Sequence, residues 1–333
     1  MPDLELNQRV GRIIKPLIPS EAAEEVARAY RQFNQAIREY IRSETGLRLT
    51  DTASDGRTAA IQVKIVEGFT DEFAELVDRY QDPVLWHLIL GQPKLAKLME
   101  GAAFVLESWD RLDGWPKLPA AAQGTQSSLK SAFAAAEALQ LIAKGDEVRK
   151  EIANIKTDWL GAYRYPPGRQ PWIEIYWMPI AMAAGMLEVE IADLTLVTLA
   201  HELAHGYTHI GYDIDGTQWP TRDFGAADVT IKEGLAQFYT QVVAEKMSVR
   251  AAGMRGAFDK LLAIQSDPYK AHKKWFKEKP EQQGEVIRFA LISARNSSTK
   301  TNEDWMKILT RASEGLRKTS NSGALFGDGS AKR

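Results

Sequence analysis

The stretch Thr198-Leu-Ala-His-Glu-Leu-Ala-His-Gly-Tyr-Thr-His-Ile-Gly211 decides how the rest of the chain is interpreted. It contains three of the five histidines of the protein, His201, His205 and His209. On a helix, residues four positions apart lie on the same face, so His201 and His205 can point at one ion. Neutral imidazole nitrogens suit zinc, and Glu202 would lie beside a water at that ion. The pattern His-Glu-x-x-His therefore predicts a metal site on a helix.

His209 does not supply a third ligand on the same helix. It lies about 12 Å from His201 along a continuous helix axis, whereas zinc–nitrogen bonds are about 2.0–2.1 Å long. The metzincin pattern has glycine three residues after the second histidine, but here Gly206 follows His205 directly. His209 is therefore either a hydrogen-bonded core histidine or a residue with another role near the site.

The composition is that of a soluble globular protein. Of 333 residues, 44% are hydrophobic and 26% are charged, which allows one large domain or two ordinary ones. The net charge of −2 gives no electrostatic reason to expect nucleic acid or an anionic membrane as a partner. There are no cysteines, so zinc would have to be bound by histidine and carboxylate.

The sequence shows neither a signal peptide nor a membrane span. The first ten residues carry two acids and no apolar core. The most apolar run, 173–200, is interrupted by Glu174, Glu188, Glu190 and Asp193. We therefore expect a cytoplasmic protein.

Periodicity predicts a mainly helical protein with a small sheet, an α+β fold. We expect irregular structure over 1–19 and a helix from Ser20 to Gly46. Further helices are expected over 58–80 with a break at Gly68, 83–91, 93–112, 128–160, 248–266, 269–277, 281–296 and 302–318. The segment Trp172–Trp177 is the best strand, and 180–188 is either strand or loop. Two helices carry the chemistry, one opening near Asp193 and one running from Asp228, its N-cap, to Met247.

Breaks in these patterns predict four parts of the chain. Residues 1–112 form a helical N-terminal region that caps a cleft, binds substrate or acts as a pro-segment. Residues 113–127 are a linker rich in Gly, Pro, Ala and Ser. Residues 128–319 form the domain with the histidines, and 320–333 are a disordered tail.

Glu233 is the strongest candidate for a third ligand. It lies in Ile231-Lys-Glu-Gly-Leu-Ala-Gln-Phe-Tyr239, on the next predicted helix, after a loop long enough to bring the two helices together. Small residues share its helical face, and Gly234 follows it. This face permits close approach to the helix of the histidines.

The two segments resemble the gluzincin group of zinc metallopeptidases over about residues 190–247. The resemblance implies a zincin-like catalytic domain with an active-site helix, an edge strand and a helical C-terminal part. It also implies one Zn²⁺ per chain, with His201, His205 and Glu233 as ligands and Glu202 as general base. Residues 172–177 resemble the edge strand along which such enzymes lay an extended substrate. Many gluzincins have Asp four residues after the ligand Glu, where it accepts a hydrogen bond from a ligand histidine. This chain has Gln237 there, so the amide oxygen of Gln237 would take that role, or else Asp228 or another acid.

The resemblance implies peptide hydrolysis, with a peptide or protein as substrate. An oxyanion donor is needed, and Tyr269 is our choice, with His272, Tyr239 and His209 as alternatives. The rival interpretation is a non-catalytic protein that binds zinc or peptides on the same fold. Substrate specificity, endo- or exopeptidase action and oligomeric state do not follow from the sequence.

Overall fold

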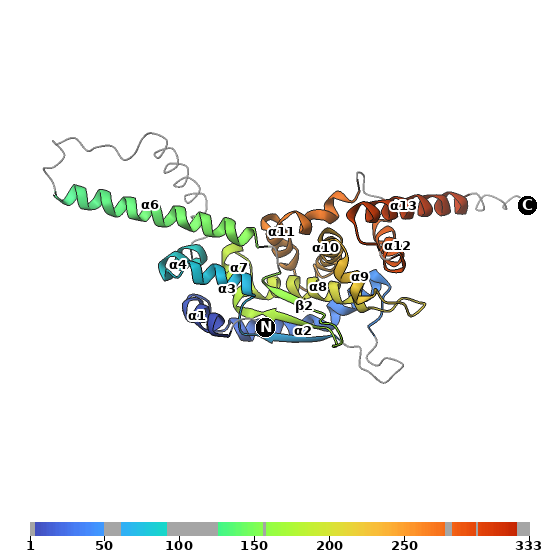
Figure 1. Cartoon of the computed structure of the whole chain (residues 1–333), viewed down its shortest axis with the longest axis horizontal. Helices are drawn as coiled ribbons and strands as arrows, with labels where there is room; N and C mark the ends of the chain where they lie inside the picture. Colours follow the sequence, from blue (N-terminus) through green and yellow to red (C-terminus); the bar gives the residue numbers. More distant parts are fainter. Residues whose placement is uncertain are drawn as a thin grey trace, which may run out of the picture. The chain divides into compact units, whose positions relative to one another are not determined.

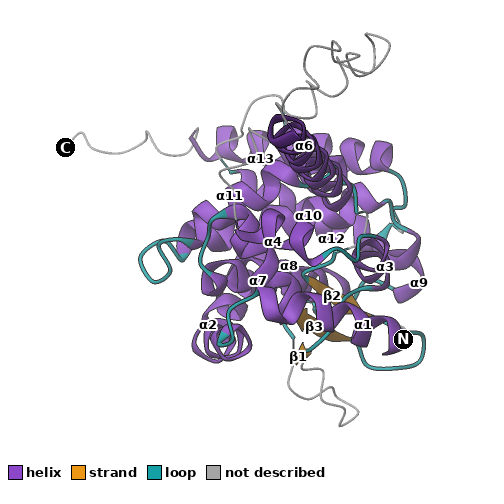
Figure 2. Cartoon of the chain, turned by 90° about the vertical axis from the view of Figure 1, so that its left-hand side faces the viewer, coloured by secondary structure: helices purple, strands orange, loops and turns teal. Residues whose placement is uncertain are grey.

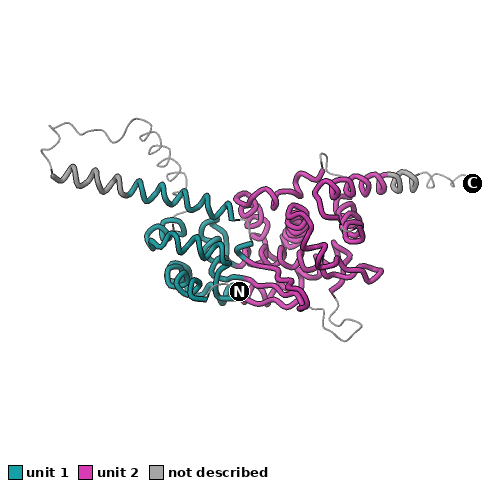
Figure 3. The backbone as a smooth tube through the Cα atoms, viewed as in Figure 1, with its two compact units in different colours: residues 1–26, 66–160, 176–191 teal, residues 27–65, 161–175, 192–333 magenta. Residues whose placement is uncertain are grey.

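The computed structural model describes residues 4–49, 61–91, 126–155, 158–276, 282–297 and 299–324. The chain divides into two compact units, each assembled from three separate stretches (Figure 3). The first comprises residues 1–26, 66–160 and 176–191, and the second comprises 27–65, 161–175 and 192–333. The two units thus interleave along the sequence. The predicted linker at 113–127 and the helix expected over 93–112 lie almost wholly outside the described residues, and the division placed there stays a prediction.

The first unit is helical where the structure describes it. Its elements are α1 (Leu4–Ile14), η1 (Lys15–Leu17), α3 (Asp71–Arg79), α4 (Pro83–Gly91), α6 (Gln126–Ala153) and α7 (Trp177–Leu187). The first helix, α1, buries Leu6, Val10 and Ile14, an apolar stripe at helical spacing. The expectation of irregular structure over 1–19 is wrong for these residues, because Pro16 lies after the last residue of α1 and does not interrupt it.

Helix α7 occupies most of the segment 180–188, for which strand or loop was expected. Nearly all of its side chains are buried, so no polar face marks its period. Pro179 lies in its first turn, where a missing N–H breaks no helical hydrogen bond. Glu188 ends the helix in a left-handed conformation with φ 51°.

The second unit contains a three-stranded sheet with the order β1-β3-β2 (Figure 2). The strands are β1 (Gln62–Val66), β2 (Gly161–Arg164) and β3 (Trp172–Tyr176). Strand β2 pairs antiparallel with β3, from Gly161 opposite Ile175 to Arg164 opposite Trp172. The helix expected over 58–80 is therefore wrong across β1 and right across α3. A mainly helical fold with a small sheet is confirmed.

Strand β3 is the central strand of this sheet, which corrects its prediction as an edge strand. Its neighbours are β1 on one side and β2 on the other. The edge next to the histidine helix is β2, whose four residues are too few to show a period. A turn joins β2 to β3, and Gly168 in this turn has φ 72°.

The other described elements of the second unit are helices (Figure 1). They are α2 (Ala22–Thr45), α8 (Ile191–Ile210), α9 (Thr221–Ala226), α10 (Val229–Lys246), α11 (Met254–Ile264), η4 (Asp267–Lys274), α12 (Gln283–Asn296) and α13 (Asn302–Ala324). The two helices predicted from near Asp193 and from Asp228 are confirmed. Asp228 is the N-cap of α10 and accepts a hydrogen bond of 2.8 Å from Thr230 N. The last helix, α13, extends five residues into the predicted tail.

Within the described part of the chain, none of the helices has both the length and the apolar character that crossing a bilayer requires.

Candidate metal centre

Helix α8 brings His201, Glu202 and His205 together in the interior of the second unit. The three side chains are 5%, 1% and 5% exposed. The helix is apolar around them, with Leu199, Leu203 and others fully buried. Burying two imidazoles and a carboxyl group among such residues costs several kcal/mol unless a partner compensates them.

Helix α10 supplies that partner, Glu233. Its Oε2 lies 3.2 Å from Nε2 of His201 and 3.3 Å from Nε2 of His205. The two Nε2 atoms are 3.1 Å from each other. Three potential ligand atoms from two helices therefore converge on one point, as the sequence predicted for His201, His205 and Glu233.

The spacing of these three atoms fits a small tetrahedral ion. Bonds of about 2.0–2.1 Å at tetrahedral angles place neighbouring ligand atoms about 3.3–3.4 Å apart, close to the observed separations. Two nitrogens and one carboxylate oxygen are also a donor set that zinc accepts. Asp158 lies two residues before the start of β2. Asp158, His201, His205 and Glu233 could together hold a metal ion. Sequence reasoning missed Asp158, because nothing in its own neighbourhood marks it.

The electrostatics of Glu233 favour its charged form. Burial raises the pKa of this carboxyl group, but the charge of His205 and the contacts with both histidines outweigh burial and lower the pKa below its ordinary value. Glu233 is thus an anion held against two imidazoles, which is the state a cation requires of its ligand.

Strand β2 runs directly past Glu202. A Cβ atom added to Gly161 would lie 2.9 Å from Cγ and Oε1 of Glu202 and 2.9 Å from Cγ2 of Thr198. A second contact lies further along α8, where a Cβ on Gly206 would meet Ile61, the residue before β1. Glycine at these two positions lets α8 lie close against the sheet, and Gly161 fixes the space that Glu202 occupies.

Tyr269 lies beside the site. It belongs to η4, is 4% exposed, and its ring centre is 5.9 Å from that of His201. The element η4 packs on α10 through Trp275, the residue after it, whose ring fills the space in which a Cβ of Gly234 would lie. Gly234 therefore admits Trp275, and not α8 as expected. Its effect is to bring Tyr269 next to a ligand histidine.

His209 is a hydrogen-bonded core histidine. Its Nδ1 is 2.9 Å from the hydroxyl of Tyr163, and its Nε2 is 3.2 Å from Oγ1 of Thr221. Its ring stacks on Phe224 with centres 4.3 Å apart. Burial, with the charges of Arg295, His205 and Lys232, lowers the pKa of His209 to about 3. It is neutral at physiological pH, so one of its ring nitrogens accepts a hydrogen bond from Tyr163 or Thr221.

The other oxyanion candidates point elsewhere. Nδ1 of His272 lies 3.2 Å from the carbonyl oxygen of Tyr269, and its Nε2 lies 3.2 Å from Oε1 of Gln241; the neutral ring donates to one of the two. Tyr239 is 1% exposed, and burial raises the pKa of its phenol well above its ordinary value. Gln237 is also buried and donates to Oε1 of Gln265 at 3.0 Å.

Gln237 and Asp228 were the residues expected to support a ligand histidine. The side-chain amide of Gln237 donates to Gln265, and Asp228 is the N-cap of α10.

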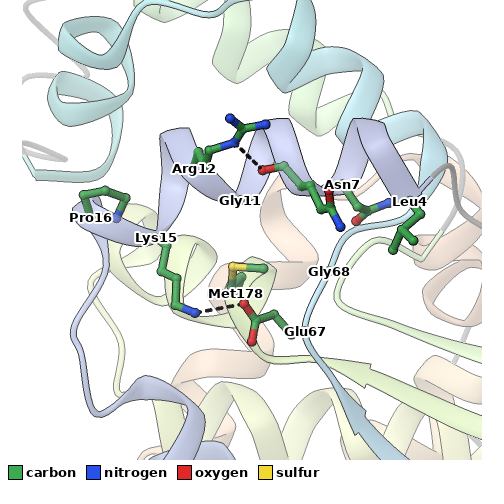
Figure 4. A pocket seen from close by; sticks show the side chains of 10 residues that line it. Leu4, Asn7, Gly11, Arg12, Lys15, Pro16, Glu67, Gly68 and Met178 are labelled. Carbon is green, nitrogen blue, oxygen red and sulfur yellow. Dashed lines mark hydrogen bonds and ion pairs between the residues drawn. The ribbon is translucent and has the colours of Figure 1, made fainter.

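A separate groove lies in the first unit and has no such cluster. It has a volume of about 870 Å³ and runs along α1, with the ion pair between Lys15 and Glu67 at 2.9 Å on one side (Figure 4). Its lining is mostly apolar or without charge, and includes Leu4, Gly11, Pro16, Gly68 and Met178. It offers no group of metal ligands or paired acids among its lining residues.

Comparisons with protein-family models, with curated proteins and with solved structures each found no significant match.

Proposed function

We propose that this protein is a zinc-dependent peptidase whose ion is held by His201, His205 and Glu233. The observation that carries the proposal is the convergence of three buried ligand atoms at separations of 3.1–3.3 Å. A carboxyl group, Glu202, adjoins this point on α8 and is itself 1% exposed. Ligands and general base together match the requirements of hydrolysis at a metal ion.

When bound, the ion supplies the Lewis acidity that activates a water molecule and polarises the carbonyl of the substrate. Glu202 takes the proton from the attacking water on its carboxylate and gives it to the leaving amine. Gly161 and Thr198 confine the Glu202 side chain, so the carboxyl group stays where the proton is released. The hydroxyl of Tyr269, beside His201, would donate to the developing oxyanion.

The outer edge of β2 offers a place for an extended peptide. Tyr176 N donates to Leu160 O at 3.0 Å, so Leu160 and Tyr176 form a hydrogen-bonded pair. The alternation of an antiparallel ladder then turns the N–H and C=O groups of Gly161 and Tyr163 away from β3. No described strand follows β2 in the sheet. A peptide added there as a strand would run past Glu202.

Two substitutions test the proposal. Glu202→Gln should keep stoichiometric zinc and lose hydrolysis by several orders of magnitude, whereas Glu233→Ala should lose zinc. Glu245→Gln, on the exposed side of the same α10 helix, is the control and should change neither. Zinc is measured by elemental analysis, and hydrolysis by mass spectrometry of a diverse peptide library.

Two outcomes would count against the proposal. If Glu233→Ala keeps stoichiometric zinc, the ligand set is wrong. If the zinc-loaded protein cuts no peptide in the library, the proposed hydrolysis is wrong, and the non-catalytic zinc- or peptide-binding protein becomes the better interpretation.

A further inference from the structure

A patch of mixed aromatic and cationic character adjoins the metal ligands in the second unit. It consists of Tyr165, Phe224, Gly225 and Lys232, and we call it the Lys232 patch. The ring centres of Tyr165 and Phe224 are 5.3 Å apart, and Nζ of Lys232 lies 5.7 Å from the centre of the Phe224 ring. A Cβ atom on Gly225 would lie 3.8 Å from the Tyr165 ring, and Lys232 Nζ is 3.4 Å from the Gly225 carbonyl oxygen. The tips of Tyr165 and Lys232 thus meet around one residue.

Lys232 is a half-buried cation that makes no salt bridge to a described carboxylate, although the charges of Glu233 and Asp228 act on it from further away. Among the described residues, no Asp or Glu oxygen lies within 4.0 Å of its Nζ, and the contact with Gly225 uses only one of its three donors. Unlike Lys232, other lysines of this unit form salt bridges on the surface. Examples are Lys246 with Glu44 and Lys307 with Glu303. Holding an ammonium group partly out of water without a carboxylate in direct contact is unfavourable, and an anionic ligand bound to it would relieve that cost.

Tyr165 provides a second free donor. Its ring is packed against Phe224 and against His209, but its hydroxyl makes no hydrogen bond within the described part of the chain. It follows β2 by one residue, at the end of the edge that a peptide would pair with. Burial and then the charge of Glu233 raise the pKa of the Tyr165 phenol, which places this hydroxyl in the field of a metal ligand.

We propose that the Lys232 patch binds a carboxylate of the peptide substrate, with Lys232 and Tyr165 as donors and the Phe224 ring as an apolar wall. The ring of Tyr165 stacks on Tyr163 with centres 5.5 Å apart, and Tyr163 stacks on the ligand His205 at 6.4 Å, so the bound carboxylate would lie close to the bond that is cut. The carboxylate is that of the peptide C-terminus or that of an acidic side chain. This inference rests on the proposed function for its substrate class.

Binding to a protein that cannot hydrolyse separates the two proposals. Zinc-loaded Glu202→Gln protein is titrated with dansyl-Ala-Phe-Leu-Ala as the free acid and as the amide, and with an amidated dansyl-Ala-Phe-Leu-Glu-Ala and its glutamine counterpart. Fluorescence anisotropy gives the affinity of each. The free acid or the glutamate peptide should bind about tenfold more tightly than its neutral partner, as a charge-assisted hydrogen bond predicts. The pair that shows the preference identifies the source of the carboxylate.

Variants of the patch then decide the matter. Lys232→Met should abolish the preference, so that the acidic and neutral peptides bind about equally. Lys232→Arg should keep most of the preference, and Tyr165→Phe should lower it by a smaller factor than Lys232→Met. Lys307→Met removes the same charge from α13 and should leave the preference unchanged. Lys232→Gln repeats the test if Lys232→Met does not fold. The inference is overturned if the Glu202→Gln protein shows no preference for the acidic peptide, or if the preference survives both Lys232→Met and Lys232→Gln.

The result is independent of hydrolysis. A carboxylate preference that depends on Lys232, in a protein that cuts no peptide, would support the Lys232 patch and reject the proposed peptidase. Hydrolysis without any such preference would support the proposed peptidase and reject the Lys232 patch.

Discussion

The Nε2 atoms of His201 and His205 lie 3.1 Å apart, and both face the same oxygen of Glu233. A neutral imidazole carries one N–H, so the two nitrogens cannot each donate to Glu233 and also to one another. If both N–H groups point to Glu233, the two nitrogens are left close together with like partial charges. One cation in the middle satisfies all three ligand atoms at once.

Zinc should stabilise the folded protein. Binding to the native state alone adds about 2.7 kcal/mol to the free energy of unfolding when free zinc exceeds the Kd by about 100-fold. Thermal unfolding with zinc and after treatment with a chelator measures the effect. His205→Ala should abolish the zinc-dependent rise in Tm, whereas His272→Gln, which lies off the ligand set, should keep it. An equal rise in His205→Ala would contradict the site.

Gly161→Ala should impair hydrolysis more than it impairs folding. The added methyl group would lie 2.9 Å from Glu202 and Thr198, closer than Cβ contacts occur, so the Glu202 side chain has to move. A misplacement of about 1 Å at the general base lowers kcat by about 100-fold. Gly256→Ala in α11 is the matched control, since its Cβ would meet no atom within 4 Å. Peptide hydrolysis and zinc content are compared for both, and a fully active Gly161→Ala protein would show that β2 does not hold Glu202.

Tyr269→Phe tests the choice of oxyanion donor. Loss of one donor to a developing oxyanion typically lowers kcat by about 100- to 1,000-fold, with little change in KM. Zinc content should stay stoichiometric, because Tyr269 is not one of the proposed ligands and phenylalanine keeps its ring beside His201. Tyr239→Phe, which removes a buried hydroxyl from α10, serves as the comparison. If Tyr269→Phe retains the kcat of the unsubstituted protein, another group stabilises the oxyanion.

Two buried histidines should make stability fall below neutral pH. Burial lowers the pKa of His209 to about 3 and that of His272 to about 4, so both are neutral in the folded protein. An unfolded histidine titrates near pH 6.5. The stabilisation that comes from keeping each histidine neutral is therefore fully present above pH 6.5. It is lost as the pH falls toward the pKa of the folded protein, by at most about 1.4 kcal/mol per pH unit for each histidine.

Urea denaturation between pH 7.5 and 5.0 measures this slope. His209→Gln keeps hydrogen-bonding groups for Tyr163 and Thr221 but cannot take up a proton, so it should flatten the slope by the share of one histidine. His272→Gln should do the same, and the two effects should add because the residues contact different partners. An unchanged slope in His209→Gln would show that this histidine is protonated in the folded state.

The sequence by itself determined the two helices that carry the site and the residues that converge on it. His201 and His205 follow from helical spacing, and the helix around them is predicted by local periodicity. Asp228 marks the start of α10 through its own hydrogen bond to Thr230, which is also local. Glu233 could be proposed because a helix of known start and length fixes which residues share its face.

Only the tertiary structure decided how the sheet is arranged around these helices. Strand β2 has four residues and no period of its own, and its pairing with β3 comes from residues across a turn. The role of Gly161 exists only because Glu202, far along the chain, lies against it. Helix α7 is buried on all sides, so it lacks the polar face from which a helix is recognised. Helical spacing is written in neighbouring residues, whereas strand order, close glycine contacts and the partners of Lys232 depend on chain segments that meet only after folding.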